Sequence, residues 1–157
     1  MDSNKNKKLK YIAIFYCVFM GIILFARFGT YTSGIPYLTQ VKAHFKTALW
    51  DSIPGYFENL INPNESVTVR AIAFINLVGN FVFFVPIGIF LPMFFKAFKR
   101  IYVFLPGVVM MIFTIESLQA ITLRGTFDSD DILLNTVAAL CGFVGYKIYI
   151  FMADYKS

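Results

Sequence analysis

Charged residues are scarce in this chain of 157 residues, because Asp, Glu, Lys and Arg together make up only 15% of it. Hydrophobic residues reach 58% and aromatic residues 18%. Soluble domains are usually about 45 to 50% apolar, and a single soluble core of this size cannot bury so much apolar surface. The composition therefore excludes an ordinary soluble domain and predicts an integral membrane protein.

Cysteine and histidine are also rare, with two Cys and one His. Cys17 and Cys141 lie in apolar segments without metal-ligand spacing, so we expect packing residues and not a disulfide or a zinc site. The chain lacks a phosphate-binding glycine loop, a nucleophile motif and a zinc-type histidine motif. These absences disfavour a conventional hydrolase or kinase and predict no cofactor.

Four apolar windows approach the roughly 20 residues that a helix needs to cross a bilayer. Helices are expected because each satisfies its own backbone polar groups in lipid. The first window lacks a small-residue cleavage site in "ILFARFGTY", which favours an uncleaved span over a signal peptide. The predicted spans of this single domain, 1–157, are 11–28, 71–95, 101–121 and 132–151.

The net charge of +5 comes from basic clusters beside apolar segments and not from one long basic stripe, so we expect no nucleic-acid partner. The sequence "KNKKLK" precedes the first span, and Lys96, Lys99 and Arg100 join the second to the third. Under the positive-inside rule both clusters lie in the cytoplasm. Four spans then place both termini of this multi-pass protein on the cytoplasmic side of the cell membrane.

The connection 29–70 is too long for a turn. Within it, Leu38, Val41 and Phe45 begin an apolar stripe at helical spacing, which predicts one amphipathic helix over 37–53 that ends at Pro54 and Gly55. A helix lying on the outer leaflet is the preferred interpretation, and a helix that caps the bundle is the alternative.

Polar residues recur at the outer ends of three spans. Asn76 and Asn80 share one helix face at a spacing of four, and Glu116 and Gln119 share another at a spacing of three. The stretch "RGTFDSDDILLN", 124–135, adds further polar residues at the start of the last span. Ionisable groups inside a bilayer are costly and usually face the bundle interior or a water-filled cavity, so we expect a polar cavity at this depth.

Some of these residues have structural alternatives. Ser129 or Asp130 can cap the last helix, with Asp131 in its first turn. The asparagines can form interhelical hydrogen bonds. Arg124 or Arg27 is the expected cation for the carboxylates, and Glu116 and Asp128 have the weakest structural explanation. Small residues predict close helix contacts at Gly88 on the second span and at Ala138, Gly142 and Gly145 on the fourth.

The motifs "NLVGNFVFFVPIGIFLP", "ESLQ" and "RGTFDSDDILLN" resemble those of the VanZ-like family of small bacterial membrane proteins. The resemblance covers roughly the C-terminal half; near Pro36 and Tyr37 the match is partial. It implies a part in resistance to teicoplanin, a glycopeptide antibiotic with an acyl tail. The matching positions are Asn76, Asn80, Phe84, Pro86, Gly88, Glu116, Gln119, Arg124, Asp128, Asp131 and Asn135.

Three functions compete. The first is a resistance factor whose outward cavity binds membrane lipids, a lipoglycopeptide or a lipid-linked cell-wall precursor. The second is an intramembrane enzyme on an envelope lipid or sugar, with Glu116 and Asp128 as acid and base, Arg124 on an anionic headgroup and a divalent ion as a weakly supported addition. The third is a scaffold held together by its polar pairs. The candidate ligand-binding residues are Asn76, Asn80, Glu116, Gln119, Arg124, Asp128, Asp131 and Asn135.

Overall fold

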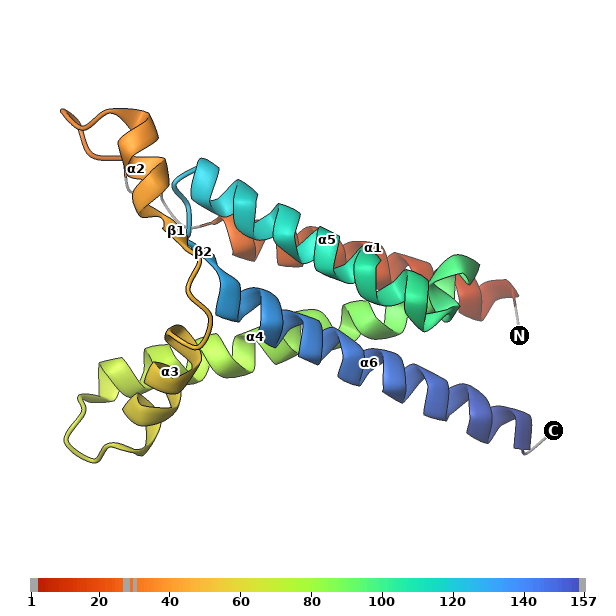
Figure 1. Cartoon of the computed structure of the whole chain (residues 1–157). Coiled ribbons are helices and arrows are strands. Elements are labelled where there is room, and N and C mark those ends of the chain that lie inside the picture. Colours follow the sequence, from red (N-terminus) through yellow and green to blue (C-terminus); the bar gives the residue numbers. More distant parts are fainter. Residues whose placement is uncertain (1–2, 27–28, 30, 156–157) are drawn as a thin grey trace.

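The computed structural model of the chain describes residues 3–26, 29 and 31–155. These residues are mainly helical, which confirms the all-α class, and four of the helices are long and apolar enough to cross a membrane (Figure 1). In chain order the elements are α1 (Ser3–Phe25), α2 (Tyr37–Ala43), β1 (Phe45–Lys46), α3 (Ser52–Ile61), α4 (Val67–Phe94), the 3₁₀ turn η1 (Lys96–Lys99), α5 (Ile101–Ile121), β2 (Phe127–Asp128) and α6 (Ser129–Tyr155).

Several helices extend beyond the apolar windows that revealed them. α4 begins at Val67 because the Ser66 side chain accepts a hydrogen bond from the backbone N–H of Val69, at 3.2 Å. Such an N-cap satisfies a backbone donor that the first turn cannot pair internally. The helix then continues through Pro86 and Pro92 to Phe94. Hydropathy finds the part of a helix that meets lipid, whereas capping groups decide where the helix starts.

α4 and α6 pack with backbone against backbone. A Cβ added to Gly88 would lie 2.0 Å from the carbonyl oxygen of Ala139, and one added to Gly142 would lie 2.0 Å from that of Val85. Only glycine permits this approach, so two of the expected small-residue contacts are confirmed. Gly145 is an exception, since a Cβ there would meet nothing within 4 Å.

The buried core lies between α4, α5 and α6. Phe104, Val108 and Ile112 lie on one side of α5, and none of the three is exposed at all. The ring of Phe104 meets that of Phe143 on α6 with centroids 4.4 Å apart. Cys17 and Cys141 are free and exposed, so they lie on the outer surface and do not have the packing role expected for them.

The prediction of one helix over 37–53 is wrong. α2 ends at Ala43, and β1 then pairs in parallel with β2, with Phe45 opposite Phe127 and Lys46 opposite Asp128. The Phe45 ring stacks on the Phe127 ring with centroids 5.0 Å apart. Pro54 lies in the first turn of α3, where a proline costs nothing because that N–H has no helical partner.

The carboxylate of Asp130 caps the start of α3 and not the start of α6, the helix to which Asp130 belongs. Its carboxylate, which is fully buried, accepts hydrogen bonds from the backbone N–H groups of Trp50, Ser52 and Ile53 at 2.7, 2.8 and 3.1 Å. These bonds also hold Trp50 at a positive φ of 62°, which a large side chain rarely adopts. The predicted role of Asp130 as the cap of the last helix is therefore wrong, because tertiary contacts use its carboxylate elsewhere.

Asp128 takes the capping position instead. It directly precedes α6, and its Oδ1 accepts from the backbone N–H of Asp130 at 2.9 Å. Its Oδ2 accepts from the Ser52 hydroxyl at 2.5 Å. The two aspartates thus join the starts of α3 and α6.

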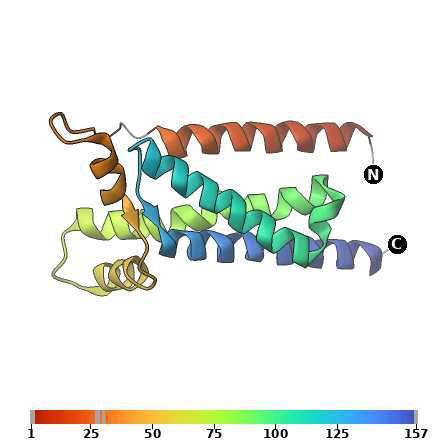
Figure 2. The ribbon, with the colours of Figure 1, turned by 45° about the horizontal axis from the view of Figure 1, so that its top comes forward.

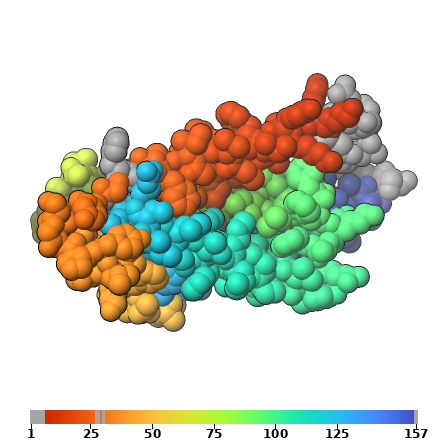
Figure 3. Space-filling view, turned by 90° about the horizontal axis from the view of Figure 1, so that it is seen from above, coloured from red at the N-terminus to blue at the C-terminus, as the bar shows by residue number. Residues whose placement is uncertain are grey.

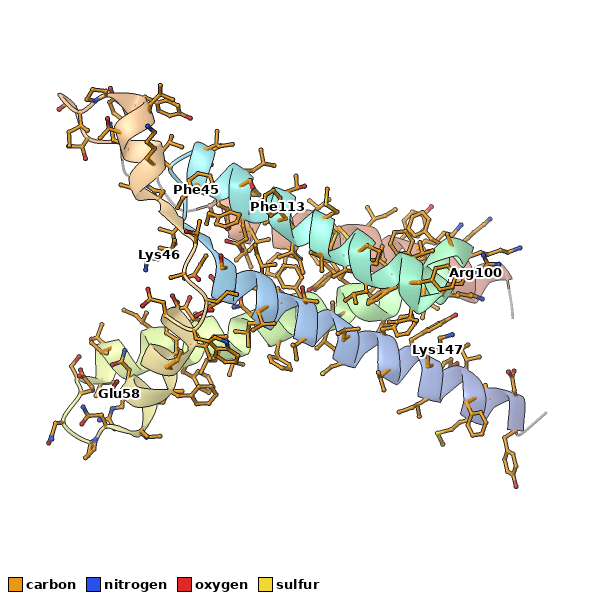
Figure 4. All side chains as sticks on the ribbon, in the orientation of Figure 1. Phe45, Lys46, Glu58, Arg100, Phe113 and Lys147 are labelled. Atoms are coloured by element: carbon orange, nitrogen blue, oxygen red, sulfur yellow. The ribbon has the colours of Figure 1, made fainter. Side chains whose placement is uncertain are left out.

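The two ends of the bundle differ in what they carry. Both described ends of the chain lie at the end where α4 meets α5, whereas α2 and α3 lie at the opposite end (Figures 1 and 2). Arg100 and Lys147 lie toward the end that holds the chain termini, and Lys46 and Glu58 lie toward the other (Figure 4). This arrangement agrees with an even number of spans.

Replacing Gly88 or Gly142 by alanine is expected to lower the free energy of unfolding by about 1 to 3 kcal/mol, because the new methyl group forces α4 and α6 apart. The measurement is thermal unfolding of the purified protein in detergent. Gly145→Ala, on the same helix as Gly142, is the matched control and is expected to change stability by less than about 1 kcal/mol. Equal effects at all three positions would contradict the close contact.

Asp130→Ala is expected to destabilise the protein by about 2 to 3 kcal/mol, because it leaves buried N–H donors at the start of α3 without an acceptor. Limited proteolysis between 44 and 66 together with thermal unfolding measures the loss. The control is Asp51→Ala, since Asp51 is exposed and makes no side-chain capping bond. A similar loss in both variants would contradict the capping role.

Candidate functional site

A cavity of about 340 Å³ lies at the end of the bundle that carries α2 and α3. Its volume falls at the lower end of the range for ligand pockets, about 300 to 1,000 Å³. Six of the eight predicted ligand-binding residues line it: Asn76, Asn80, Glu116, Gln119, Asp131 and Asn135. The further lining residues are Ile23, Leu24, Tyr56, Ile72, Ile75, Gly79, Phe83, Phe84, Gly125 and Thr126.

Three of the carboxamides in the cavity are oriented by the protein. The Nδ2 group of Asn80 donates to Asp131 Oδ1 at 3.2 Å, which joins α4 to α6. The Nδ2 group of Asn76 donates to the carbonyl of Ile72 at 2.9 Å, one turn earlier on its own helix. The Nε2 group of Gln119 donates to the carbonyl of Leu24 at 3.0 Å. Since only the NH₂ end can donate to these acceptors, each bond fixes which way the carboxamide points.

Asn135 differs from the other three. It is 2% exposed, and its Oδ1 has no hydrogen-bond partner among the described residues. A buried acceptor without a donor costs free energy, and nearly all such groups in folded proteins are paired. Among the described residues, the Oδ1 of Asn135 therefore does not accept the interhelical hydrogen bond that the sequence offered as an alternative.

Two carboxyl groups reach the same cavity. Glu116 lies on the buried side of α5 and is 5% exposed, and Asp131 lies in the first turn of α6. Glu116 is thus a deeply buried ionisable residue inside a span, the type of residue that most often marks a functional site in membrane proteins.

Arg124 and Asp128 are not among the residues that line the cavity. Arg124 donates from Nη1 to the carbonyl of Phe25 at 2.6 Å, and so satisfies a backbone acceptor at the end of α1. Its position follows from the end of α5, where Leu123 adopts a positive φ of 55° and the backbone N–H of Arg124 returns to the carbonyl of Gln119 at 2.9 Å. Arg27, the other expected cation, lies outside the described residues.

The apolar wall of the cavity was not predicted. Ile72 and Ile75 line the cavity and are also exposed, at 54% and 64%. Ile72 and Ile75 thus give the cavity an apolar wall that continues onto the exposed face of α4, a helix long and apolar enough to cross a membrane. Gly79 could have been recognised because it follows Asn76 by three positions on the same helix face. Tyr56 gave no sequence signal, because it comes from the connection between spans.

α1 covers the cavity with only its last turn, through Ile23 and Leu24. In the space-filling view α1 forms a ridge beside α5, and α2 lies at the end where the cavity is (Figure 3). The Tyr16 hydroxyl donates to the carbonyl of Phe83, which attaches α1 to α4 farther along the bundle. The residues that line the cavity thus come from all four long helices, from α3 and from the connection between α5 and β2.

The described residues that line the cavity include carboxamides, carboxyl groups and apolar side chains but no Lys, Arg or His. No group of three or more His, Cys, Asp and Glu within the described residues is placed to hold a metal ion. The cavity can therefore accept hydrogen bonds at several points and pack apolar groups along one wall.

The model of the VanZ/LLP1 family matches residues 12–151, which include the whole of α4 and α5 and most of α1 and α6. No curated protein and no solved structure matches the chain. The family match covers nearly the whole chain, including the half in which the motif resemblance was only partial. The chain is a member of the VanZ-like family of membrane proteins.

Proposed function

We propose that this protein binds a lipid-tailed ligand in the cavity between its four long helices and thereby contributes to resistance against teicoplanin-type antibiotics. The ligand is the acylated drug or a lipid-linked cell-wall precursor. One observation carries the proposal: a polar cavity inside the bundle continues into an apolar wall that is exposed at Ile72 and Ile75, on a helix long and apolar enough to cross a membrane.

An amphiphile fits such a site because its two parts need different surroundings. The headgroup would meet Asn80, Glu116 and Asn135, and the acyl chain would lie along the isoleucines of α4. Ligand pockets commonly combine apolar walls with a few converging polar groups. A tail that stays in the bilayer also lowers the cost of entry, since it need not leave lipid.

We further propose that the cavity opens toward the outer leaflet of the bacterial cell membrane. The basic residues Lys96, Lys99 and Arg100 lie at the opposite end of the bundle, and such clusters favour the cytoplasm. This orientation gives the cavity access to the leaflet where antibiotics and precursors meet the cell wall.

The enzyme alternative receives no specific support from the geometry. Glu116 lines the cavity, but both oxygens of Asp128 accept hydrogen bonds at the junction of α3 and α6. The acid and base expected from the sequence therefore do not both line this cavity.

Gly79→Phe tests the binding proposal, because a Cβ on Gly79 meets only the Phe83 side chain, at 4.0 Å, and a phenyl ring would fill the cavity. A susceptible strain is given the wild-type protein, this variant or the empty vector. We expect the strain with the variant to have the minimal inhibitory concentration of teicoplanin of the empty-vector strain, below that of the wild-type strain. A glycopeptide without an acyl tail is expected to be unaffected.

Gly21→Phe is the matched control, because a Cβ on Gly21 of α1 meets nothing within 4 Å. It should keep wild-type resistance at equal abundance, which immunoblotting of the membranes measures. Wild-type resistance in the strain that carries Gly79→Phe would contradict the proposal.

The orientation is tested with single cysteines placed at Glu58 or Lys99 in a chain whose Cys17 and Cys141 are replaced by serine. A membrane-impermeant maleimide added to intact cells is expected to label position 58 and to leave position 99 unlabelled until the cells are lysed. Labelling of position 99 alone would reverse the orientation.

A further inference from the structure

The hydrogen bonds inside the cavity leave an excess of acceptors. Asn76, Asn80 and Gln119 each use one of their two N–H donors on a protein oxygen, so one N–H and the carboxamide oxygen, with its two lone pairs, remain for a ligand. Asn135 adds a buried Oδ1 without a partner among the described residues. Four carboxamide oxygens, on α4, α5 and α6, can therefore accept hydrogen bonds from a ligand.

We propose that the headgroup bound in this cavity is a hydroxyl-rich, neutral one, a glycosyl or polyol group carried on a lipid tail. This inference rests on the proposed ligand binding and names its chemical class. Each hydroxyl donates one hydrogen bond and can also accept. Several hydroxyls around one ring can reach acceptors on three helices at the same time.

A phosphate headgroup is a poor match for these carboxamides. A phosphate diester offers acceptors only, and the bonds to Ile72, Asp131 and Leu24 already occupy one of the two N–H donors of each oriented carboxamide, which leaves a single N–H on each. A phosphate bound by the remaining N–H groups would place its negative charge in a cavity that is also lined by the carboxyl groups of Glu116 and Asp131. Arg124, the described cation expected to hold an anionic headgroup, bonds to Phe25 and does not line the cavity.

An ammonium headgroup also donates, but its protons sit on one nitrogen and gather acceptors in a single shell. Asn76 and Asn80 are one turn apart on α4, and Gln119 and Asn135 come from two further helices. Acceptors spread in this way suit donors that are spread over a ring. Apolar surface beside them, at Phe83 and Phe84, suits the carbon face of a sugar.

The test compares three lipids with identical acyl chains on the purified full-length protein in an amine-oxide detergent, which has no sugar headgroup. The lipids are monoglucosyl diacylglycerol, phosphatidic acid and phosphatidylethanolamine, and native mass spectrometry gives each Kd. We expect the glucosyl lipid to bind with a Kd at least about tenfold lower than that of either phospholipid, the scale of one or two hydrogen bonds.

Asn135→Leu is expected to raise the Kd of the glucosyl lipid about tenfold while the Tm without lipid stays level or rises, because a buried acceptor without a donor is removed. A merely structural Asn135 would instead lower the Tm. Thr114→Val is the control, since Thr114 is exposed on α5 and bonds only to the carbonyl of Met110. It should leave every Kd unchanged.

The outcomes separate the two proposals. If either phospholipid binds most tightly and Asn135→Leu weakens that binding, the hydroxyl-rich headgroup is overturned and lipid binding in the cavity stands. If none of the three lipids binds, or Asn135→Leu leaves every Kd unchanged, both proposals fall.

Discussion

Gly88 and Gly142 let the backbones of α4 and α6 touch, and this contact sets the register between the two helices. Asn80 precedes Gly88 by eight positions, and its partner Asp131 precedes Ala139 by the same number. The helices run in the same direction, so equal spacing carries the contact at the glycines to the polar pair, about 12 Å away along the axis. The position of Asn76 and Asn135 at the cavity follows from the same register. A larger side chain at either glycine would move every polar group on one wall.

The polar residues of the cavity could be predicted because burial in lipid restricts them. A carboxamide or carboxylate inside a span must face other helices, and the depth of Asn80, Glu116 and Asn135 along their helices follows from topology. The four spans could be predicted for the same reason, since apolar length leaves few alternatives. Where the chain leaves the membrane, these restrictions end.

Apart from Cys17 and Cys141, which are exposed on α1 and α6, the errors lie in that part. The stripe formed by Leu38, Val41 and Phe45 continues through 37–53, yet the helix breaks because backbone groups after Ala43 pair with Phe127 and then with the carboxylate of Asp130. Contacts so distant in sequence leave no local pattern. Asp128 and Asp130 illustrate this: they are two positions apart and chemically identical, but one caps its own helix and the other caps α3. Arg124 could not be assigned either, because a cation near a helix end has the same sequence signal whether it binds a ligand or a carbonyl of α1.

The shared direction of α4 and α6 also has an electrostatic consequence. Peptide dipoles add along a helix and leave partial positive charge at its N-terminus, so two parallel neighbours present like partial charges at the same end of the bundle. In neighbouring antiparallel helices the partial charges at each end have opposite signs and offset one another, but α4 and α6 run in the same direction and do not offset each other in this way. The carboxylates of Asp128 and Asp131 sit at the start of α6, next to the partial positive charge of that helix, whereas α4 begins at Val67, well before the residues that pack beside this point. These acidic residues thus offset the positive end of α6, the one of the two parallel helices whose N-terminus lies beside its neighbour's middle.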